Sequence, residues 1–255
     1  MPAPTELQPP VLALDTSTDH IAAALAAGGR LHTASAPGGP QASAALMPLI
    51  QSLLARGGTR LQDLAYVAFG RGPGAFTGLR TACAVAQGLG LGLGLARPLL
   101  PLDSLLIVAE DARAQHAAQA ATLDVAVAMD ARMDEVYAGR YRWSAGHWQP
   151  LQAPGLYPLD VLAAEWAALP GHVLAGSALP AFGDRLALPA AWPRVPQELD
   201  RAGALLRLAL RAAQAGEGVD AAQALPLYLR DKVAFTTAER EAIRQAKDAA
   251  AGRQP

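Results

Sequence analysis

Two halves of the chain repeat the same order of turns, apolar stretches and glycines, and this repeat restricts the possible folds more than any other feature. The segment DTSTD at 15–19 joins two short apolar stretches, and DARMD at 130–134 does the same in the second half. Further along, VAFGRGPGAF at 67–76 matches VLAGSALPAF at 173–182 in its valine, one glycine and its Ala-Phe pair. A unit that occurs twice predicts two similar lobes.

Each half predicts the order strand, strand, strand, helix, strand, helix. Apolar runs of strand length are separated by turn residues, and leucines at helical spacing follow the third strand. In the first half the strands are expected at 11–15, 21–26, 30–36 and 65–69, and the helices at about 41–56 and 78–94. In the second half the strands are expected at 123–130, 135–142, 147–151 and 172–176, with a helix at about 158–168. Two βββαβα units side by side resemble the ribonuclease-H-like lobes of actin-like ATPases (the ASKHA class), an α/β fold.

The repeat also gives expected domain limits. We expect a disordered tail at 1–10, a first lobe at 11–110, a second, smaller lobe at 111–225, and a C-terminal segment, partly a tail, at 226–255. An amphipathic helix at 200–215 is expected either to close the second lobe or to pack back on the first.

Composition narrows the class of protein. With 52% hydrophobic and 17% charged residues, the chain has the composition of a globular protein. Its net charge of −1 gives no field able to hold nucleic acid unaided, so a partner would have to supply most phosphate contacts. The single cysteine, Cys83, fits a reducing compartment, and the N-terminus lacks the regions of a secretory signal. A cytoplasmic protein without a membrane span is expected.

Two glycine- and hydroxyl-rich turns are candidate phosphate-type loops. Asp15, Thr16 and Ser17 have the D-x-[GST]-[ST] form of the turn that faces nucleotide phosphates in actin-like ATPases, where the acid often orders magnesium. The alternative is an acid and hydroxyls that satisfy a tight turn through bonds to the backbone. The second loop can form an anion nest at a helix N-terminus, or a rigid turn that orients the next helix. Its residues are Gly70, Arg71, Gly72 and Gly74, with Thr77 as the expected N-cap.

Metal chemistry finds little support in the sequence. The five histidines include no pair three or four residues apart, so no helical histidine pair exists. Cys83 has no histidine nearby in the sequence and is expected to be a buried, inert thiol. No metal and no cofactor are expected.

The helix expected at 78–94 is unusual for its small residues. It contains glycine at 88, 90, 92 and 94, and each interior glycine costs roughly 0.5–1 kcal/mol relative to alanine. Close approach of another backbone would offset this cost. That backbone can belong to the sheet of the same chain or to a partner.

Four stretches of the chain resemble the TsaB (YeaZ) family. They are LALDTST, FGRGPGAFTGLR with AQGLGLG, MDARMDEVYAGRY and PLYLR, which together span about 11–237. The resemblance implies an actin-like pseudo-enzyme that pairs with its larger paralogue TsaD, the transferase that places threonylcarbamoyl on the adenosine beside the tRNA anticodon. It also implies docking of a TsaE-like ATPase, only indirect contact with tRNA, and a homodimer when alone. The two metal-binding histidine positions of TsaD fall on Ser104 and Val108 here, which cannot replace them.

The partner is expected to bind the two helices at 41–56 and 78–94. The residues expected at this interface are Ala45, Leu46, Leu49, Ser52 and Leu53 in the first helix and Arg80, Cys83, Ala84, Gln87, Gly88 and Leu91 in the second. Two other functions stay open at this stage. One is an ATP-dependent, kinase-like phosphotransferase that uses Asp15 and the glycine loops, and the other is a metallopeptidase, which would require bound metal.

Overall fold

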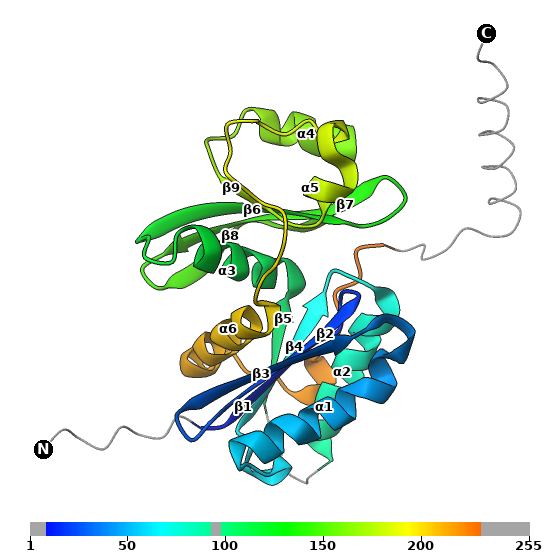
Figure 1. Cartoon of the computed structure of the whole chain (residues 1–255), viewed down its shortest axis with the longest axis vertical. Helices are drawn as coiled ribbons and strands as arrows, with labels where there is room; N and C mark the ends of the chain where they lie inside the picture. Colours follow the sequence, from blue (N-terminus) through cyan, green and yellow to red (C-terminus); the bar gives the residue numbers. More distant parts are fainter. Residues whose placement is uncertain (1–8, 93–97, 231–255) are drawn as a thin grey trace, which may run out of the picture.

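The chain forms two α/β lobes, one above the other in Figure 1. The computed structural model describes residues 9–92 and 98–230. The first lobe contains β1 (Val11–Asp15), β2 (His20–Ala27), β3 (Arg30–Pro37), α1 (Ala42–Gly57), β4 (Tyr66–Gly72), α2 (Phe76–Leu91) and β5 (Leu99–Asp103). The second contains α3 (Ser104–His116), β6 (Thr122–Asp130), β7 (Glu135–Ser144), β8 (His147–Pro158), α4 (Leu159–Ala167), β9 (Val173–Ala175), α5 (Ala178–Phe182) and β10 (Arg194–Val195). Helix α6 (Arg201–Ala215) follows, and short 3-10 turns lie at Gly39–Gln41, Leu61–Asp63, Gly183–Arg185 and Ala221–Gln223.

The two sheets have the same topology, which confirms the predicted fold class. The first sheet has the order β3-β2-β1-β4-β5 and the second the order β8-β7-β6-β9-β10. In each sheet the first three strands are antiparallel, and the fourth runs parallel to the first. The duplicated sequence pattern therefore corresponds to a duplicated structure.

The helix that follows each sheet packs on the other sheet. Helices α1 and α2 cover one face of the first sheet, and α6 covers its opposite face. Helices α4 and α5 cover one face of the second sheet, and α3 covers the face that looks toward the first lobe. Of the two placements expected for 200–215, the structure thus has the helix back on the first lobe, although these residues fall within the range expected for the second. Helices α3 and α6 lie between the sheets and join the lobes.

Some expected boundaries need correction. Strand β4 continues to Gly72, so part of the expected glycine loop is strand. Helix α2 starts at Phe76 with Ala75 as its N-cap, so the prediction of Thr77 as N-cap is wrong. The reason is that Ala75 N–H donates to the carbonyl of Ser17 (2.8 Å), which fixes the start of the helix against the first turn. Helix α2 ends at Leu91, and residues 93–97 lie outside the described part of the chain.

Helix α1 contains a proline inside its span. The helix begins at Ala42, six residues before Pro48. Pro48 is exposed, and Gly58, in the left-handed region, ends the helix. Among residues 9–92 and 98–230, no helix is both long and apolar enough to cross a membrane. Of the segments expected to be tails, 1–10 and 226–255, residues 1–8 and 231–255 lie outside the described part of the chain.

Candidate functional site

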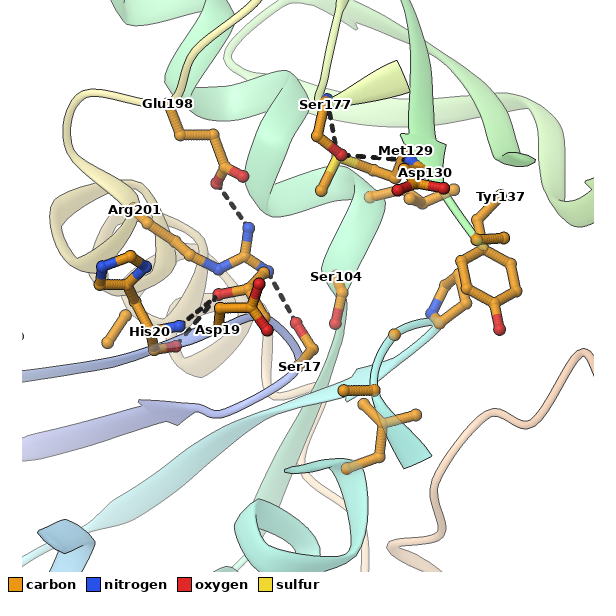
Figure 2. A pocket seen from close by; sticks show the side chains of 18 of the residues that line it. Ser17, Asp19, His20, Ser104, Met129, Asp130, Tyr137, Ser177, Glu198 and Arg201 are labelled. Carbon is orange, nitrogen blue, oxygen red and sulfur yellow. Dashed lines mark hydrogen bonds and ion pairs between the residues drawn. The ribbon is translucent and has the colours of Figure 1, made fainter. Parts of the chain in front are cut away.

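A cleft of about 1030 Å³ lies between the two lobes. The repeated turns at 15–19 (the first turn) and 130–134 (the second turn) face each other across it. Residues from both lobes line this cleft, as Figure 2 shows. Arg132 of the second turn approaches Asp19 of the first, with 3.8 Å between guanidinium nitrogen and carboxylate oxygen. The cleft is where a two-lobed fold of this class would take a ligand, so its chemistry decides what the protein can do.

The first turn satisfies its own polar groups. The backbone N–H of Ser17 donates to Asp15 Oδ1 (2.6 Å), and the Ser17 hydroxyl donates to Asp15 Oδ2 (3.0 Å). The Thr16 hydroxyl donates to the carbonyl of Gly78 (2.6 Å). Asp15, Thr16 and Ser17 are all buried, and Asp15 is 0% exposed. These contacts favour the alternative in which the acid and hydroxyls hold a tight turn.

The glycines of the second loop pack directly on this turn. A Cβ atom on Gly70 would lie 2.6 Å from Asp15 Oδ2, and one on Gly74 would lie 2.6 Å from the Ser17 carbonyl oxygen. On Gly78 it would lie 1.8 Å from the carbonyl oxygen of Thr16. The glycines thus allow two loops of the same chain to touch, as the rigid-turn interpretation predicts.

The other residues expected in this loop have separate environments. Gly72, at φ +117°, lies against the carbonyl of Leu227, where a Cβ would approach to 2.7 Å. Arg71 turns to Asp103 and donates from Nε to its carboxylate (2.8 Å). Thr77 is exposed in the first turn of α2. The residues expected to form one anion nest therefore lie in three separate environments.

Arg201 completes the first turn, and sequence reasoning missed it. Its guanidinium donates to Asp15 Oδ2 (2.8 Å) and to the Ser17 hydroxyl (2.9 Å). It also pairs with Glu198, and Figure 2 shows Arg201 between Ser17 and Glu198. Only 10% of its side chain is exposed. Burial alone would lower the pKa of this guanidinium, but the charges of Asp15 and Glu198 outweigh burial and raise its pKa. No local signal marked Arg201, because Asp15 is 186 residues away in sequence.

The fold class implies a metal-bound nucleotide at the first turn. The side chains of this turn do not fit such a ligand. The Asp15 carboxylate already accepts bonds from Ser17 and Arg201, and the Thr16 hydroxyl is directed to Gly78. The position where a cation would balance Asp15 is filled by Arg201. Within 9–92 and 98–230, no three His, Cys, Asp or Glu side chains converge in a way that could hold a metal ion.

The segment 226–230, named here the strap, crosses from the first lobe to the second. Leu227 N–H donates to the carbonyl of Arg71 (2.7 Å) in the first lobe. The Tyr228 ring lies 4.8 Å from the Phe76 ring, and Arg80 Nε donates to the Tyr228 hydroxyl (3.1 Å). In the second lobe, Arg230 pairs with Glu135 (2.6 Å). These residues of the expected C-terminal segment are therefore part of the folded body.

The second turn receives the end of the strap. Arg132, Met133 and Asp134 are consecutive residues in the left-handed region, with φ of 65°, 57° and 56°. Such a backbone is costly for residues other than glycine and needs support from its surroundings. The support includes Arg230, which donates to the carbonyl oxygens of Ala131 (3.0 Å) and Arg132 (3.3 Å).

Three of the residues expected at the partner interface are buried in the structure, so they do not belong to that surface. Leu46 and Leu53 are 0% exposed and Cys83 is 4% exposed, because all three point into the core of the first lobe. The Cys83 thiol also donates to the Ala224 carbonyl (3.0 Å), and burial raises its pKa. These three predictions are wrong for a simple reason: on an amphipathic helix, the regularly spaced leucines face the sheet.

The remaining expected residues lie at or near the surface. Ser52, Arg80, Ala84, Gly88 and Leu91 are exposed, and Ala45, Leu49 and Gln87 are half-buried. Gln87 is engaged within the chain, since its amide donates to the Ala221 and Ala224 carbonyls. Among residues 9–92 and 98–230, a Cβ on Gly88 would meet nothing within 4 Å. Packing against this part of the chain therefore does not require glycine at 88.

The two lobes and the filled turn between them define a protein of the actin-like class whose phosphate-type turn is occupied by its own side chains. A family model described as TsaD, tRNA N6-adenosine threonylcarbamoyltransferase, matches residues 39–162. The TsaB protein of Escherichia coli K12, a tRNA threonylcarbamoyladenosine biosynthesis protein, is 30% identical over 88% of this chain and 96% of its own. TsaB of Haemophilus influenzae is 39% identical over 50% of this chain and 51% of its own. The structure of YeaZ from Pseudomonas aeruginosa is 37% identical, covers 86% of this chain and 99% of its own, and superposes with a TM-score of 0.75. The chain belongs to the TsaB family of tRNA threonylcarbamoyladenosine biosynthesis proteins.

Proposed function

We propose that this chain is a non-catalytic docking subunit in the synthesis of threonylcarbamoyladenosine in tRNA. It binds a TsaD-like transferase through the exposed parts of α1 and α2. A TsaE-like ATPase joins through that pair, and contact with tRNA is indirect. The observation that carries the proposal is the open surface of α2 around Gly88, where none of the described residues packs closely enough to require glycine.

The composition of this surface suits another helical surface. Helices α1 and α2 contain no Asp or Glu, and their exposed positions include the small residues Ser52, Ala84 and Gly88. Small residues allow helix axes to approach closely. Leu91 is 63% exposed, and Leu225, which follows the carbonyl that Cys83 and Gln87 contact, is 62% exposed. Covering apolar area of this kind contributes about 25 cal/mol per Å².

The same surface explains the homodimer expected when the partner is absent. A mostly apolar helical face without acidic residues that matches a related protein also matches a second copy of itself, related by a two-fold axis. The two assemblies then compete for one surface. Adding the TsaD-like paralogue should convert the homodimer into a heterodimer.

The proposal is tested with bulky substitutions at the open positions. Gly88→Trp and Ala84→Arg should abolish copurification with the TsaD-like paralogue and reduce the native mass of the isolated chain to that of a monomer. Both positions are exposed, so thermal unfolding should change little. Val161→Trp on α4, at a position 49% exposed, is the matched control and should leave both assemblies intact. Copurification that survives the α2 substitutions would refute this face.

The phosphotransferase alternative makes a different prediction. It requires Mg-ATP in the cleft and catalysis that depends on Asp15. The pairing of Asp15 with Arg201 opposes it, because the carboxylate is not free to order magnesium. Calorimetry of the isolated chain with Mg-ATP, wild type against Asp15→Asn, separates the two functions.

A further inference from the structure

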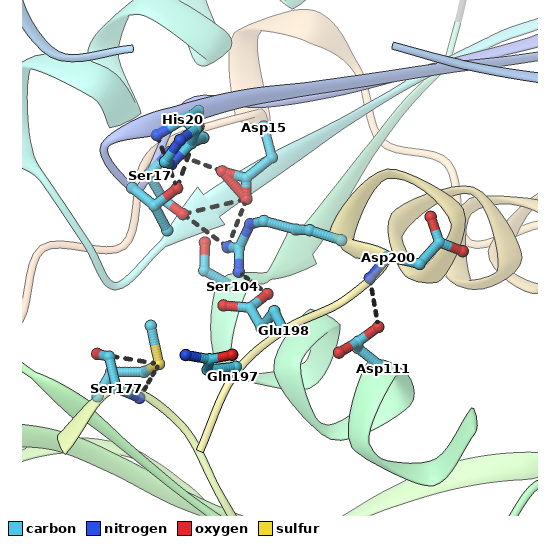
Figure 3. Close-up of polar contacts among 12 residues, drawn as sticks. Asp15, Ser17, His20, Ser104, Asp111, Ser177, Gln197, Glu198 and Asp200 are labelled. Carbon is cyan, nitrogen blue, oxygen red and sulfur yellow. Dashed lines mark hydrogen bonds and ion pairs between the residues drawn. The ribbon is translucent and has the colours of Figure 1, made fainter. Parts of the chain in front are cut away.

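The guanidinium of Arg201 lies among oxygen atoms that would otherwise suit a divalent cation. Asp15 Oδ2 lies 2.8 Å away, the Ser17 hydroxyl 2.9 Å away, and Glu198 pairs with the opposite side of the guanidinium. Carboxylate and hydroxyl oxygens are the ligands preferred by Mg²⁺, Mn²⁺ and Ca²⁺. Figure 3 shows Asp15 beside Ser17, with Glu198 nearby, and all three contact the same guanidinium.

We propose that Arg201 is a built-in cation that replaces a divalent metal ion at the Asp15 turn. The side chain supplies the positive charge permanently, from the first turn of α6. The native protein therefore takes neither a divalent cation nor a metal-bound nucleotide at this turn. Substitution of Arg201 by an uncharged residue uncovers a cation site formed by Asp15, Ser17 and Glu198.

Burial of Asp15 is the physical reason to expect this exchange. The carboxylate is 0% exposed, and a buried charge without a partner is strongly unfavourable. When Arg201 is lost, the buried charge of Asp15 can be neutralised in two ways: the carboxylate binds a proton, or it binds a cation from solution. The space that the guanidinium leaves opens onto the cleft, which gives ions from solution access. Asp15 and Ser17 contact one terminal nitrogen of the guanidinium and Glu198 contacts the other, so Glu198 has to move inward for all three to reach one ion at metal–oxygen distances of about 2.0–2.6 Å.

The inference also explains why Arg201 is held at the Asp15 turn, a contact that docking of a partner does not require. A turn that needs a metal or nucleotide to balance its charge changes with the concentration of that ligand. A tethered guanidinium keeps the turn, the glycines that pack on it and the start of α2 in one arrangement. The partner-binding end of the protein is then independent of metal and nucleotide.

The test measures Mn²⁺ binding by electron paramagnetic resonance on the isolated full-length chain, together with thermal unfolding with and without Mn²⁺. Arg201→Met should bind one Mn²⁺ with a dissociation constant below about 1 mM. Its unfolding midpoint should be lower than that of the native protein and should rise by several degrees in millimolar Mn²⁺. The native protein and Arg201→Lys, which keeps the positive charge, should bind none at this turn. Asp15→Asn in the Arg201→Met background should remove the binding.

Three outcomes would overturn the inference. One is Mn²⁺ binding to the native protein that Asp15→Asn removes, and another is a folded Arg201→Met variant that binds no Mn²⁺. Should Arg201→Met fail to fold without metal, refolding is measured with and without Mn²⁺. Recovery only with Mn²⁺ supports the inference, and failure in both is the third contrary outcome. None of these readouts involves the partner protein, so the docking proposal stands or falls separately.

Discussion

Gly78 and Gly88 belong to one helix, yet they serve opposite purposes. A Cβ on Gly78 would collide with the Thr16 carbonyl oxygen at 1.8 Å, whereas one on Gly88 would meet no described part of the chain within 4 Å. Gly78→Ala should therefore lower the free energy of unfolding by about 2 kcal/mol or more through overpacking. Gly88→Ala should raise it by about 0.5–1 kcal/mol, because alanine is the better helix former. Urea unfolding of both variants checks the contrast, and equal effects would contradict it.

Single residues also mark the limit of what the sequence could reveal about the site. Asp15 and the glycines stand in recognisable local patterns, so their neighbourhood was predictable. Arg201 has no such pattern, since its two partners in the turn are 184 and 186 residues away. Leu46 and Leu53 were misplaced because helical spacing identifies one apolar face but not whether that face meets a sheet or a partner.

At the scale of elements, the strap is the connection whose contribution can be measured most directly. Arg230 pairs with Glu135, donates to the carbonyls of the left-handed turn, and is 13% exposed in its side chain. Arg230→Ala removes charged hydrogen bonds, each worth about 1.5–3 kcal/mol. We expect the free energy of unfolding to fall by about 2 kcal/mol, measured by urea denaturation. Leu225→Ala, at an exposed position just before the strap, should change it by less than about 0.5 kcal/mol. Equal effects of the two substitutions would show that the strap does not hold the lobes.

The order of the helices and strands was predictable from the sequence. That α3 and α6 each pack on the sheet of the other repeat was not. Alternating apolar runs and turn residues predicted four strands in each repeat but not the two-residue strand β10, and the equal strand orders follow from the duplication. The apolar residues of α6 indicated that this helix packs on a sheet. They contained no information on which of two similar sheets receives the helix, because both sheets offer small and branched side chains.

At the scale of the whole molecule, one buried carboxylate joins the helices that connect the lobes. Glu110 on α3 is 0% exposed and pairs with Arg207 (2.7 Å) and Arg211 (3.4 Å) on α6. It also accepts from Arg113 (3.0 Å) and from the indole N–H of Trp148 (2.9 Å). Burial alone would raise the pKa of this carboxyl, but the hydrogen bonds from Arg113 and Trp148 and the charges on α6 outweigh burial and lower its pKa to about 2.

This lowered pKa gives the molecule a stability that depends on pH. The pKa falls from an ordinary 4.5 to about 2 on folding, so the ionised carboxylate stabilises the fold above pH 4.5. The contribution, about 3 kcal/mol at neutral pH, is lost as the pH falls through the interval toward 2. Glu110→Gln should therefore lower the free energy of unfolding by at least that amount at pH 7. The difference between native and variant proteins should stay constant above pH 5 and shrink between pH 4.5 and 2.

Chemical denaturation at several pH values measures this difference directly. Glu217→Gln, at an exposed position just after α6, is the matched control and should have the same stability as the native protein throughout. A difference for Glu110→Gln that does not vary with pH would mean that packing, and not charge, accounts for the loss. Because Glu110 connects α3 on the second sheet with α6 on the first, its loss should also weaken the coupling between lobes. Unfolding monitored by Trp143 and Trp148 in the second lobe should then separate from unfolding monitored by circular dichroism of the whole chain.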